Sequence, residues 1–175
     1  MNKTINLFID MDGTIAKFYH KENYLELMYE KNYFRTLPTY AIAKKINNFA
    51  KQDTCVQVYI LSACVESEYC EQEKVEWLVE NMPNINPDHF IFTKVGENKV
   101  AKAREIVEDF ENNINLLLDD YTYNLEQWEM SLGLCMGVKF LNGINDTTKS
   151  WKGKKVKTFK QLERLLQQCA MYGCD

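Results

Sequence analysis

Two hydrophobic patterns alternate along most of the chain. Short runs rich in Ile, Val, Leu and Phe alternate with longer stretches in which apolar residues recur every three or four positions. The short runs are typical of strands buried on both faces, and the longer stretches are typical of helices with one buried stripe. The expected strands cover residues 4–9, 55–61, 90–92, 114–118 and 137–141. This alternation predicts an α/β fold: a three-layer, Rossmann-like parallel sheet covered by helices.

Each predicted helix has a stripe of apolar residues that we expect to face the sheet. The stripes are Ile42/Ile46/Phe49, Val75/Leu78/Val79/Met82, Val100/Ala103/Val107/Phe110 and Leu125/Trp128/Leu132. A last helix over residues 159–172 carries Phe159, Leu162, Leu166 and Cys169 on one face. We expect it to pack on the same sheet.

Residues 17–39 do not follow the alternation. They are rich in aromatic residues, come directly after the first strand, and predict one short helix around residues 22–31. Ligands of parallel sheets bind beyond the carboxyl ends of the strands. We therefore expect a single domain over residues 1–175 in which residues 17–39 form a small helical cap over the site.

Composition limits the class of partner. The 175 residues are 46% hydrophobic and carry a net charge of -4, which gives no basic surface for binding polymeric nucleic acid. A small anion remains a plausible ligand, because a few aimed cations control the local potential. No apolar run reaches the roughly 18 residues of a membrane span. The six cysteines form no C-x-x-C pair, and we interpret them as free thiols of a cytoplasmic protein. Monomer and homodimer both remain open.

Acidic residues follow two of the predicted strands. The first strand leads into Asp10 and Asp12, and the fourth leads into Asp119 and Asp120, while Ser62 ends the second strand. These side chains are expected to meet at one edge of the sheet. Four close carboxylates repel one another, and a divalent cation relieves that repulsion. Ligands that are all oxygen atoms favour Mg²⁺.

The ordered motifs Asp10-Met11-Asp12-Gly13-Thr14, Ser62 and Asp119-Asp120 resemble the haloacid dehalogenase-like phosphohydrolase superfamily. The resemblance implies that Asp10 attacks phosphorus to form an aspartyl-phosphate and that Asp12 acts as general acid and then as general base. It also implies that Asp10, the backbone carbonyl of Asp12 and the Asp119/Asp120 pair hold Mg²⁺. Ser62 would donate a hydrogen bond to the phosphoryl group.

The superfamily also places a lysine beside the nucleophile. Lys94, Lys99 and Lys102 all lie between the third and fourth predicted strands. We favour Lys99, because it stands where a loop leads into the next helix, with Lys102 as the second choice. The phase of that helix decides between them.

A narrower resemblance is to the 5'(3')-deoxyribonucleotidases of this superfamily. Its D-M-D-G stretch with a later phenylalanine matches Asp10 to Phe18, its F-x-x-x-P segment matches Phe34 to Pro38, and its D-D-x-x-x-N-x-x-x-W stretch matches Asp119 to Trp128. The resemblance implies a nucleoside monophosphate substrate whose base contacts Phe18 and Phe34. Departures from the family pattern are Thr14, Lys17, Ala63 and Thr39-Tyr40.

Other interpretations stay open at this point. The rings of Phe18 and Phe34 could form a small aromatic core within the cap instead of a base site. The enzyme could act on a sugar phosphate or another small phosphorylated metabolite. A third alternative is a catalytically idle module that binds a phosphorylated ligand. The intact Asp12 argues against it, because binding alone requires no proton shuttle.

Overall fold

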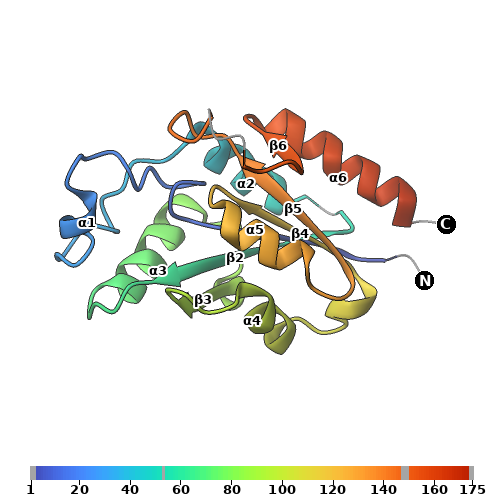
Figure 1. Cartoon of the computed structure of the whole chain (residues 1–175), viewed down its shortest axis with the longest axis horizontal. Helices are drawn as coiled ribbons and strands as arrows, with labels where there is room; N and C mark the ends of the chain where they lie inside the picture. Colours follow the sequence, from blue (N-terminus) through green and yellow to red (C-terminus); the bar gives the residue numbers. More distant parts are fainter. Residues whose placement is uncertain (1–2, 53, 147–149, 174–175) are drawn as a thin grey trace.

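A sheet of six parallel strands forms the centre of the computed structural model, which describes residues 3–52, 54–146 and 150–173 (Figure 1). The strands are β1 (Ile5–Ile9), β2 (Val56–Cys64), β3 (Phe90–Lys94), β4 (Ile114–Asp119), β5 (Leu134–Phe140) and β6 (Lys154–Val156). Their order across the sheet is β3-β2-β1-β4-β5-β6. The order reverses at β1, so the ends of β1 and its neighbours β2 and β4 lie at the switch point where such sheets bind ligands.

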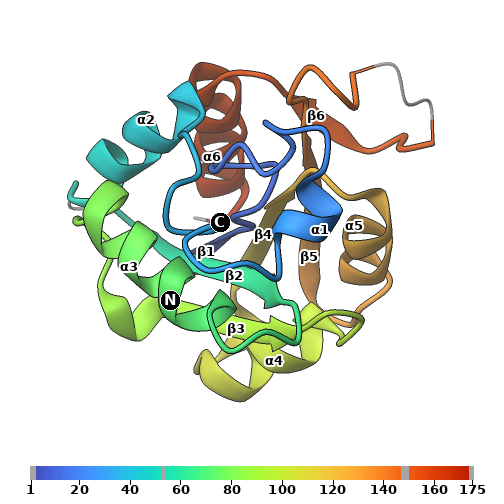
Figure 2. The same ribbon diagram turned by 90° about the vertical axis from the view of Figure 1, so that its left-hand side faces the viewer.

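Helices cover both faces of the sheet, as Figure 2 shows. One face carries α2 (Ala41–Ala50), α3 (Cys70–Asn81) and α6 (Phe159–Gly173). The other face carries α4 (Lys99–Ile106) and α5 (Thr122–Glu129). Short 3-10 turns, η1 (Pro87–His89) and η2 (Phe110–Asn112), precede β3 and β4. This arrangement confirms the predicted three-layer, Rossmann-like fold.

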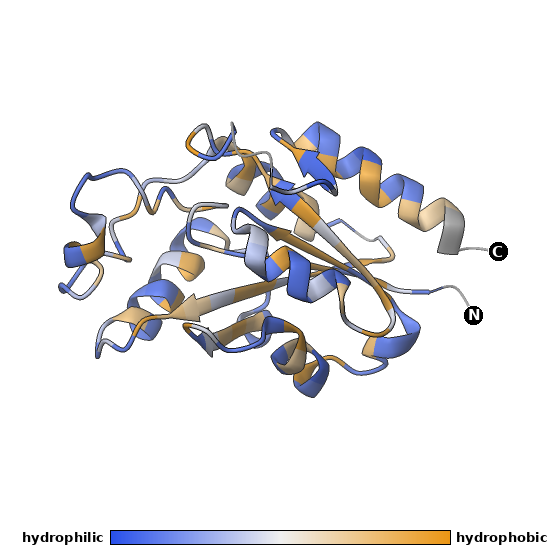
Figure 3. Cartoon of the chain, in the orientation of Figure 1, coloured by the Kyte–Doolittle hydropathy of each residue, from blue (hydrophilic) through white to orange (hydrophobic). Residues whose placement is uncertain are grey.

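Strand β1 contributes to both cores because its side chains alternate between the two faces. Ile5, Leu7 and Ile9 pack with the α2, α3 and α6 side, and Phe8 packs with the α4 and α5 side. Burying each such side chain contributes about 1.5–3 kcal/mol. The strands are accordingly the apolar centre of the molecule, and hydrophilic residues are concentrated on the helices and loops around them (Figure 3). Two rigid cores therefore hold the ends of β1, β2 and β4 in place.

The five predicted strands all lie in this sheet, but two predicted helix stripes are wrong in part. Val79 is 52% exposed, because the buried face of α3 runs through Cys70, Lys74, Trp77 and Leu78. Leu132 is 81% exposed, because α5 ends at Glu129. Val107 and Phe110 are buried as expected, although α4 ends before them.

Residues 17–39 lie beyond the carboxyl ends of the strands, where Figure 1 shows α1 at one end of the molecule. The helix there, α1 (Tyr24–Leu27), is shorter than the predicted one. Aromatic rings hold the segment together: Phe18 packs edge-on against Tyr24 and Tyr33. The two ends of the segment lie next to each other, because Ala16 and Thr39 form an antiparallel bridge.

Among the described residues, no helix is both long and apolar enough to cross a membrane. Five cysteines, at positions 55, 64, 70, 135 and 169, are free thiols. Cys174 lies outside the described residues.

Candidate active site

The loop after β1 presents Asp10 and Asp12 at the carboxyl edge of the sheet. The amide of Asp10 donates to the carbonyl of Leu118 on β4, at 2.9 Å, so Asp10 is still held by the neighbouring strand. Gly13 then turns the chain with φ +80, in the left-handed region that favours glycine. The side chain of Asp10 remains 9% exposed and that of Asp12 20% exposed. A small ligand can therefore reach both carboxylates.

Three carboxylates meet around one point at this edge. Oxygen atoms of Asp10, Asp119 and Asp120 all lie within 4.8 Å of one another, and all three residues are buried. The ammonium group of Lys99 lies 2.6 Å from Asp10 Oδ1 and 2.8 Å from Asp119 Oδ2. Three carboxylates and one ammonium leave two formal negative charges, which one divalent cation neutralises. The donor set is made of oxygen atoms only, so it fits Mg²⁺.

The pKa shifts report the same crowding of charge. Burial raises the pKa of Asp10 to about 7, and the neighbouring carboxylates of Asp119 and Asp12 add to that rise against the opposing charge of Lys99. Burial and the carboxylates of Asp119 and Asp10 likewise raise the pKa of Asp120 well above its ordinary value. Burial lowers the pKa of Lys99, but the two carboxylates more than offset this and raise it overall. The site is therefore built to receive positive charge.

Asp119 and Asp120 differ in how their oxygens are used. Asp119 Oδ1 accepts from the amide of Tyr121 at 2.8 Å, and Oδ2 accepts from Lys99 and from Asn124 Nδ2, each at 2.8 Å. Asp120 Oδ2 accepts from Asn142 Nδ2 at 2.9 Å. Both oxygens of Asp119 thus accept hydrogen bonds from described residues, whereas Oδ1 of Asp120 is available to bind a cation.

The structure separates the three candidate lysines. Lys99 is the first residue of α4 and reaches the carboxylates, as described above. Lys94 is exposed at the end of β3. Lys102 pairs with Glu105 on the surface of α4, at 3.0 Å. The phase of α4 therefore directs Lys99 to the site and Lys102 to solvent.

Lys74 is a further buried cation that the sequence analysis missed. It lies on α3 with 0% of its side chain exposed, and its ammonium group donates to Asp12 Oδ2 at 2.5 Å and to Ser62 Oγ at 3.1 Å. Burial lowers the pKa of Lys74, but the charge of Asp12 more than offsets this and raises it overall. The available signal was its spacing of four from Cys70 and Leu78, which places it on the buried face of α3.

Phe34 belongs to residues 17–39 and is part of the hydrophobic core. It is 1% exposed and stacks with Phe18 at a ring-centroid distance of 6.1 Å, while the Lys74 ammonium lies 4.7 Å from its centroid. A base cannot stack on a ring buried in this way, so the expected base contact at Phe34 is not available in this conformation. Phe18 itself is partly exposed.

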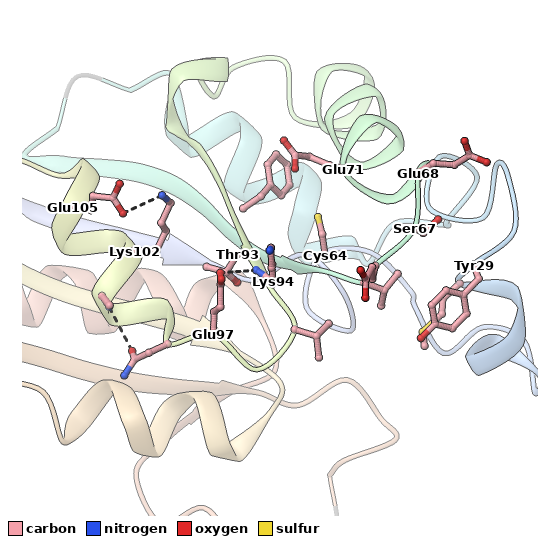
Figure 4. Close-up of a pocket in the computed structure, with 17 residues that line it drawn as sticks. Tyr29, Cys64, Ser67, Glu68, Glu71, Thr93, Lys94, Glu97, Lys102 and Glu105 are labelled. Carbon is pink, nitrogen blue, oxygen red and sulfur yellow. Dashed lines mark hydrogen bonds and ion pairs between the residues drawn. The ribbon is translucent and has the colours of Figure 1, made fainter.

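Of two large cavities in the described part of the chain, only the smaller has one of the clustered carboxylates in its wall. The larger, about 1110 Å³, runs from Tyr29 past Cys64 to Lys102 and Glu105, and Figure 4 shows the glutamates and lysines along it. The smaller, about 690 Å³, has Asp120 in its wall together with the rings of Tyr19, Tyr24 and Tyr121. The smaller cavity therefore joins aromatic surface to one of the clustered carboxylates.

Comparison with known proteins found relatives in sequence and in fold. No family model matches the chain. Curated proteins named putative 5'(3')-deoxyribonucleotidase, from Staphylococcus aureus strains MSSA476 and Mu50, are 27% identical over 131 residues, which are 73% of this chain and 63% of theirs. The chain thus spans less than two thirds of the length of these relatives.

Solved structures show the same fold at low sequence identity. A phosphoserine phosphohydrolase-like protein from Francisella tularensis subsp. tularensis SCHU S4 matches with a TM-score of 0.59 and 11% identity, over 93% of this chain and all of that one. DsGPDH of Dunaliella salina matches with a TM-score of 0.58 and 13% identity, over 90% of this chain and 28% of that one. At these identities both likenesses concern the fold alone, and the curated relatives carry the name of a putative nucleotidase.

Proposed function

We propose that this protein is a Mg²⁺-dependent phosphomonoester hydrolase that works through an aspartyl-phosphate on Asp10 and acts on nucleoside monophosphates. The observation that carries the proposal is the meeting of Asp10, Asp119 and Asp120 with Lys99 at the carboxyl edge of the sheet. The naming of the Staphylococcus aureus relatives as putative deoxyribonucleotidases supports the nucleotide as substrate.

The carboxylates of Asp10 and Asp120 and the backbone carbonyl of Asp12 are the proposed ligands of Mg²⁺. When bound, Mg²⁺ would neutralise charge on the phosphoryl group and on the acids around it. Asp119 is the less suitable ligand, because both its oxygens already accept hydrogen bonds from the protein. Its role in the proposal is to hold Lys99.

In the proposed reaction, a carboxylate oxygen of Asp10 attacks phosphorus, and the bond from phosphorus to the ester oxygen breaks. Asp12 gives its proton to that departing oxygen. Water then attacks phosphorus, Asp12 accepts a proton from it, and the bond to Asp10 breaks to release phosphate. Lys99 offsets the negative charge beside Asp10, and Ser62 donates a hydrogen bond to a phosphoryl oxygen.

The cap, residues 17–39, is proposed to cover the substrate. Phe18 remains a proposed contact for the base, and the open rings of Tyr19 and Tyr24 in the cavity beside Asp120 offer further stacking surface. Stacking a base on such a ring contributes about 1–3 kcal/mol. The burial of Phe34 favours the second candidate, a phosphatase for sugar phosphates or other small metabolites, because it removes one of two expected base contacts.

The test is phosphate release from a panel of deoxyribo- and ribonucleoside monophosphates and of sugar phosphates, with Mg²⁺ present. Release confined to the nucleotides supports the first candidate, and release from sugar phosphates supports the second. The variant Asp10→Asn is measured in parallel, because activity that persists in it belongs to a contaminating phosphatase. Absence of release from every substrate would overturn the proposed activity and leave an idle binding module.

A further inference from the structure

We propose that Lys74 is a positioning residue that holds Asp12 and Ser62 in the orientation their chemistry requires. The proposal rests on the phosphatase function proposed above. Lys74 lies on α3, 62 residues along the chain from Asp12, and is fully buried.

All three protons of the Lys74 ammonium group have acceptors. Besides Asp12 Oδ2 at 2.5 Å and Ser62 Oγ at 3.1 Å, it donates to the carbonyl of Ala63 at 2.6 Å. An ammonium group carries three donors and no acceptor, so these contacts satisfy it completely. Burying an ion costs several kcal/mol, and an apolar residue would fill this place beside Trp77 and Leu78 without that cost. The partners, two of them proposed site residues, indicate that the charge is retained for the site.

The contact with Ser62 fixes the direction of its hydroxyl proton. Because Oγ accepts a hydrogen from Lys74, its own proton must point away from that ammonium group. The Ser62 proton is therefore available to an acceptor other than Lys74, which is what donation to a phosphoryl oxygen requires. A freely rotating hydroxyl would lose orientation entropy on binding phosphate.

The contact with Asp12 divides the two oxygens of its carboxyl group. Oδ2 is bound to Lys74, whereas Oδ1 is buried and has no hydrogen-bond partner among the described residues. A buried carboxylate oxygen without a partner is costly, and a ligand would relieve that cost. Lys74 thus holds one oxygen of Asp12 and fixes the orientation of the whole carboxyl group.

Lys74 and Lys99 have separate roles in this arrangement. Lys99 contacts Asp10 and Asp119, and Lys74 contacts Asp12. Loss of Lys74 should therefore impair proton transfer to the leaving oxygen more than attack by Asp10. This difference separates a positioning role from a merely structural one.

The experiment compares Lys74→Met with the wild type on two substrates, a nucleoside monophosphate and p-nitrophenyl phosphate. The nucleoside leaves as a basic oxygen that needs a proton, whereas p-nitrophenolate leaves without one. We expect kcat/KM for the nucleotide to fall about 100-fold and that for p-nitrophenyl phosphate to fall less than about tenfold. Lys160→Met, which removes an exposed lysine of α6, is the matched control and should leave both unchanged.

An equal fall on the two substrates, or no fall on either, would overturn the positioning role. Circular dichroism checks that the variant is folded, and Lys74→Gln, which keeps a hydrogen-bond donor, replaces it if it is not. Failure of both variants to fold would also overturn the proposal, because the role of Lys74 would then be structural. A wild-type protein inactive on both substrates would instead overturn the proposed function.

Discussion

Glu73 and Lys74 are consecutive buried residues of α3 that hold two different parts of the site. The carboxylate of Glu73 accepts hydrogen bonds from the backbone amides of residues 32–35: from Asn32, from Phe34 at 3.1 Å and from Arg35 at 3.5 Å. The ammonium of Lys74 binds Asp12. One turn of one helix therefore connects the proposed cap to the proposed acid.

The first prediction concerns Glu73. Glu73→Ala leaves three backbone amides without their acceptor, and we expect it to destabilise the protein by about 1–3 kcal/mol. Amide hydrogen exchange at residues 32–35 should accelerate more than exchange in β1. Glu80→Ala, at an exposed position of the same helix, is the control. Unchanged protection at residues 32–35 would show that Glu73 does not anchor this segment.

The second prediction concerns Lys99. Lys99→Met leaves the buried carboxylates of Asp10 and Asp119 without their shared cation, and it removes positive charge from the proposed phosphoryl position. We expect kcat to fall by about 10²–10³-fold. Lys102→Met tests the competing assignment, and its fall in kcat should be smaller than that of Lys99→Met by a factor of at least about ten. Similar losses in the two variants would count against the assignment of Lys99.

The sequence was sufficient to predict that Asp10 and Asp119 stand where β1 and β4 end, whereas Ser62 lies two residues before the end of β2. Parallel strands place their carboxyl ends at one edge, so Asp10, Ser62 and Asp119 could be brought together without knowing any loop. The strand order was not needed for this step.

Lys74 could not be found in the same way. The stripe containing Val75 and Val79 seemed the natural buried face of α3, because the observed phase buries two charged residues, Glu73 and Lys74. That phase is favourable because both charged residues have buried partners. The partners are Asp12 and the amides of residues 32–35, which lie far away in the chain and cannot be identified from the sequence of α3. The burial of Phe34 could not be predicted for the same reason, because Lys74, one of the residues that cover its ring, is distant in the sequence.

The third prediction is a pH dependence of stability in the absence of metal. The pKa of Asp10 is about 7 in the folded protein and about 3.9 in an unfolded chain. As the pH rises between these values, the unfolded chain releases this proton while the folded protein keeps it, so stability falls by up to about 4 kcal/mol. The raised pKa of Asp120 acts in the same direction. Urea unfolding in EDTA at pH 5 and pH 7.5 measures the effect.

Asp10→Asn is the control for this pH dependence, because it removes the titrating group. The stability of the wild type relative to this variant should therefore fall as the pH rises. A constant difference between the two proteins would contradict the prediction.

The fourth prediction concerns metal addition. A divalent cation that binds only the folded protein stabilises it by about 2.7 kcal/mol at a concentration 100 times its Kd. We expect Mg²⁺ to raise the Tm at pH 7.5, and Asp120→Asn to reduce this rise, because Asp120 is a proposed ligand. Asp146→Asn, which changes an exposed ion pair with Lys157, is the control and should keep it. An equal response of all three proteins would argue against a metal at the carboxylate cluster.

The fifth prediction concerns Gly13, whose backbone lies against the site. Its φ of +80 disfavours any other residue, and a Cβ built there would lie 2.7 Å from Asp120 Cγ and 2.8 Å from a ring carbon of Tyr19. Gly13→Ala should therefore displace the Asp120 carboxylate as well as strain the turn. Gly133 separates the two effects, because it has a φ of +100 and a Cβ there meets only ordinary contacts at 3.7 Å or more.

Both alanine variants should lose stability from left-handed strain, by about 1–2 kcal/mol at Gly133 and by more at Gly13. Only Gly13→Ala should also weaken the rise in Tm with Mg²⁺ and lower phosphate release, because only there does the added methyl group reach a proposed ligand. Thermal unfolding with and without Mg²⁺, together with phosphate release, measures all of these effects. If the two variants respond alike to Mg²⁺, Gly13 is required for the turn alone and the close approach to Asp120 has no part in binding metal.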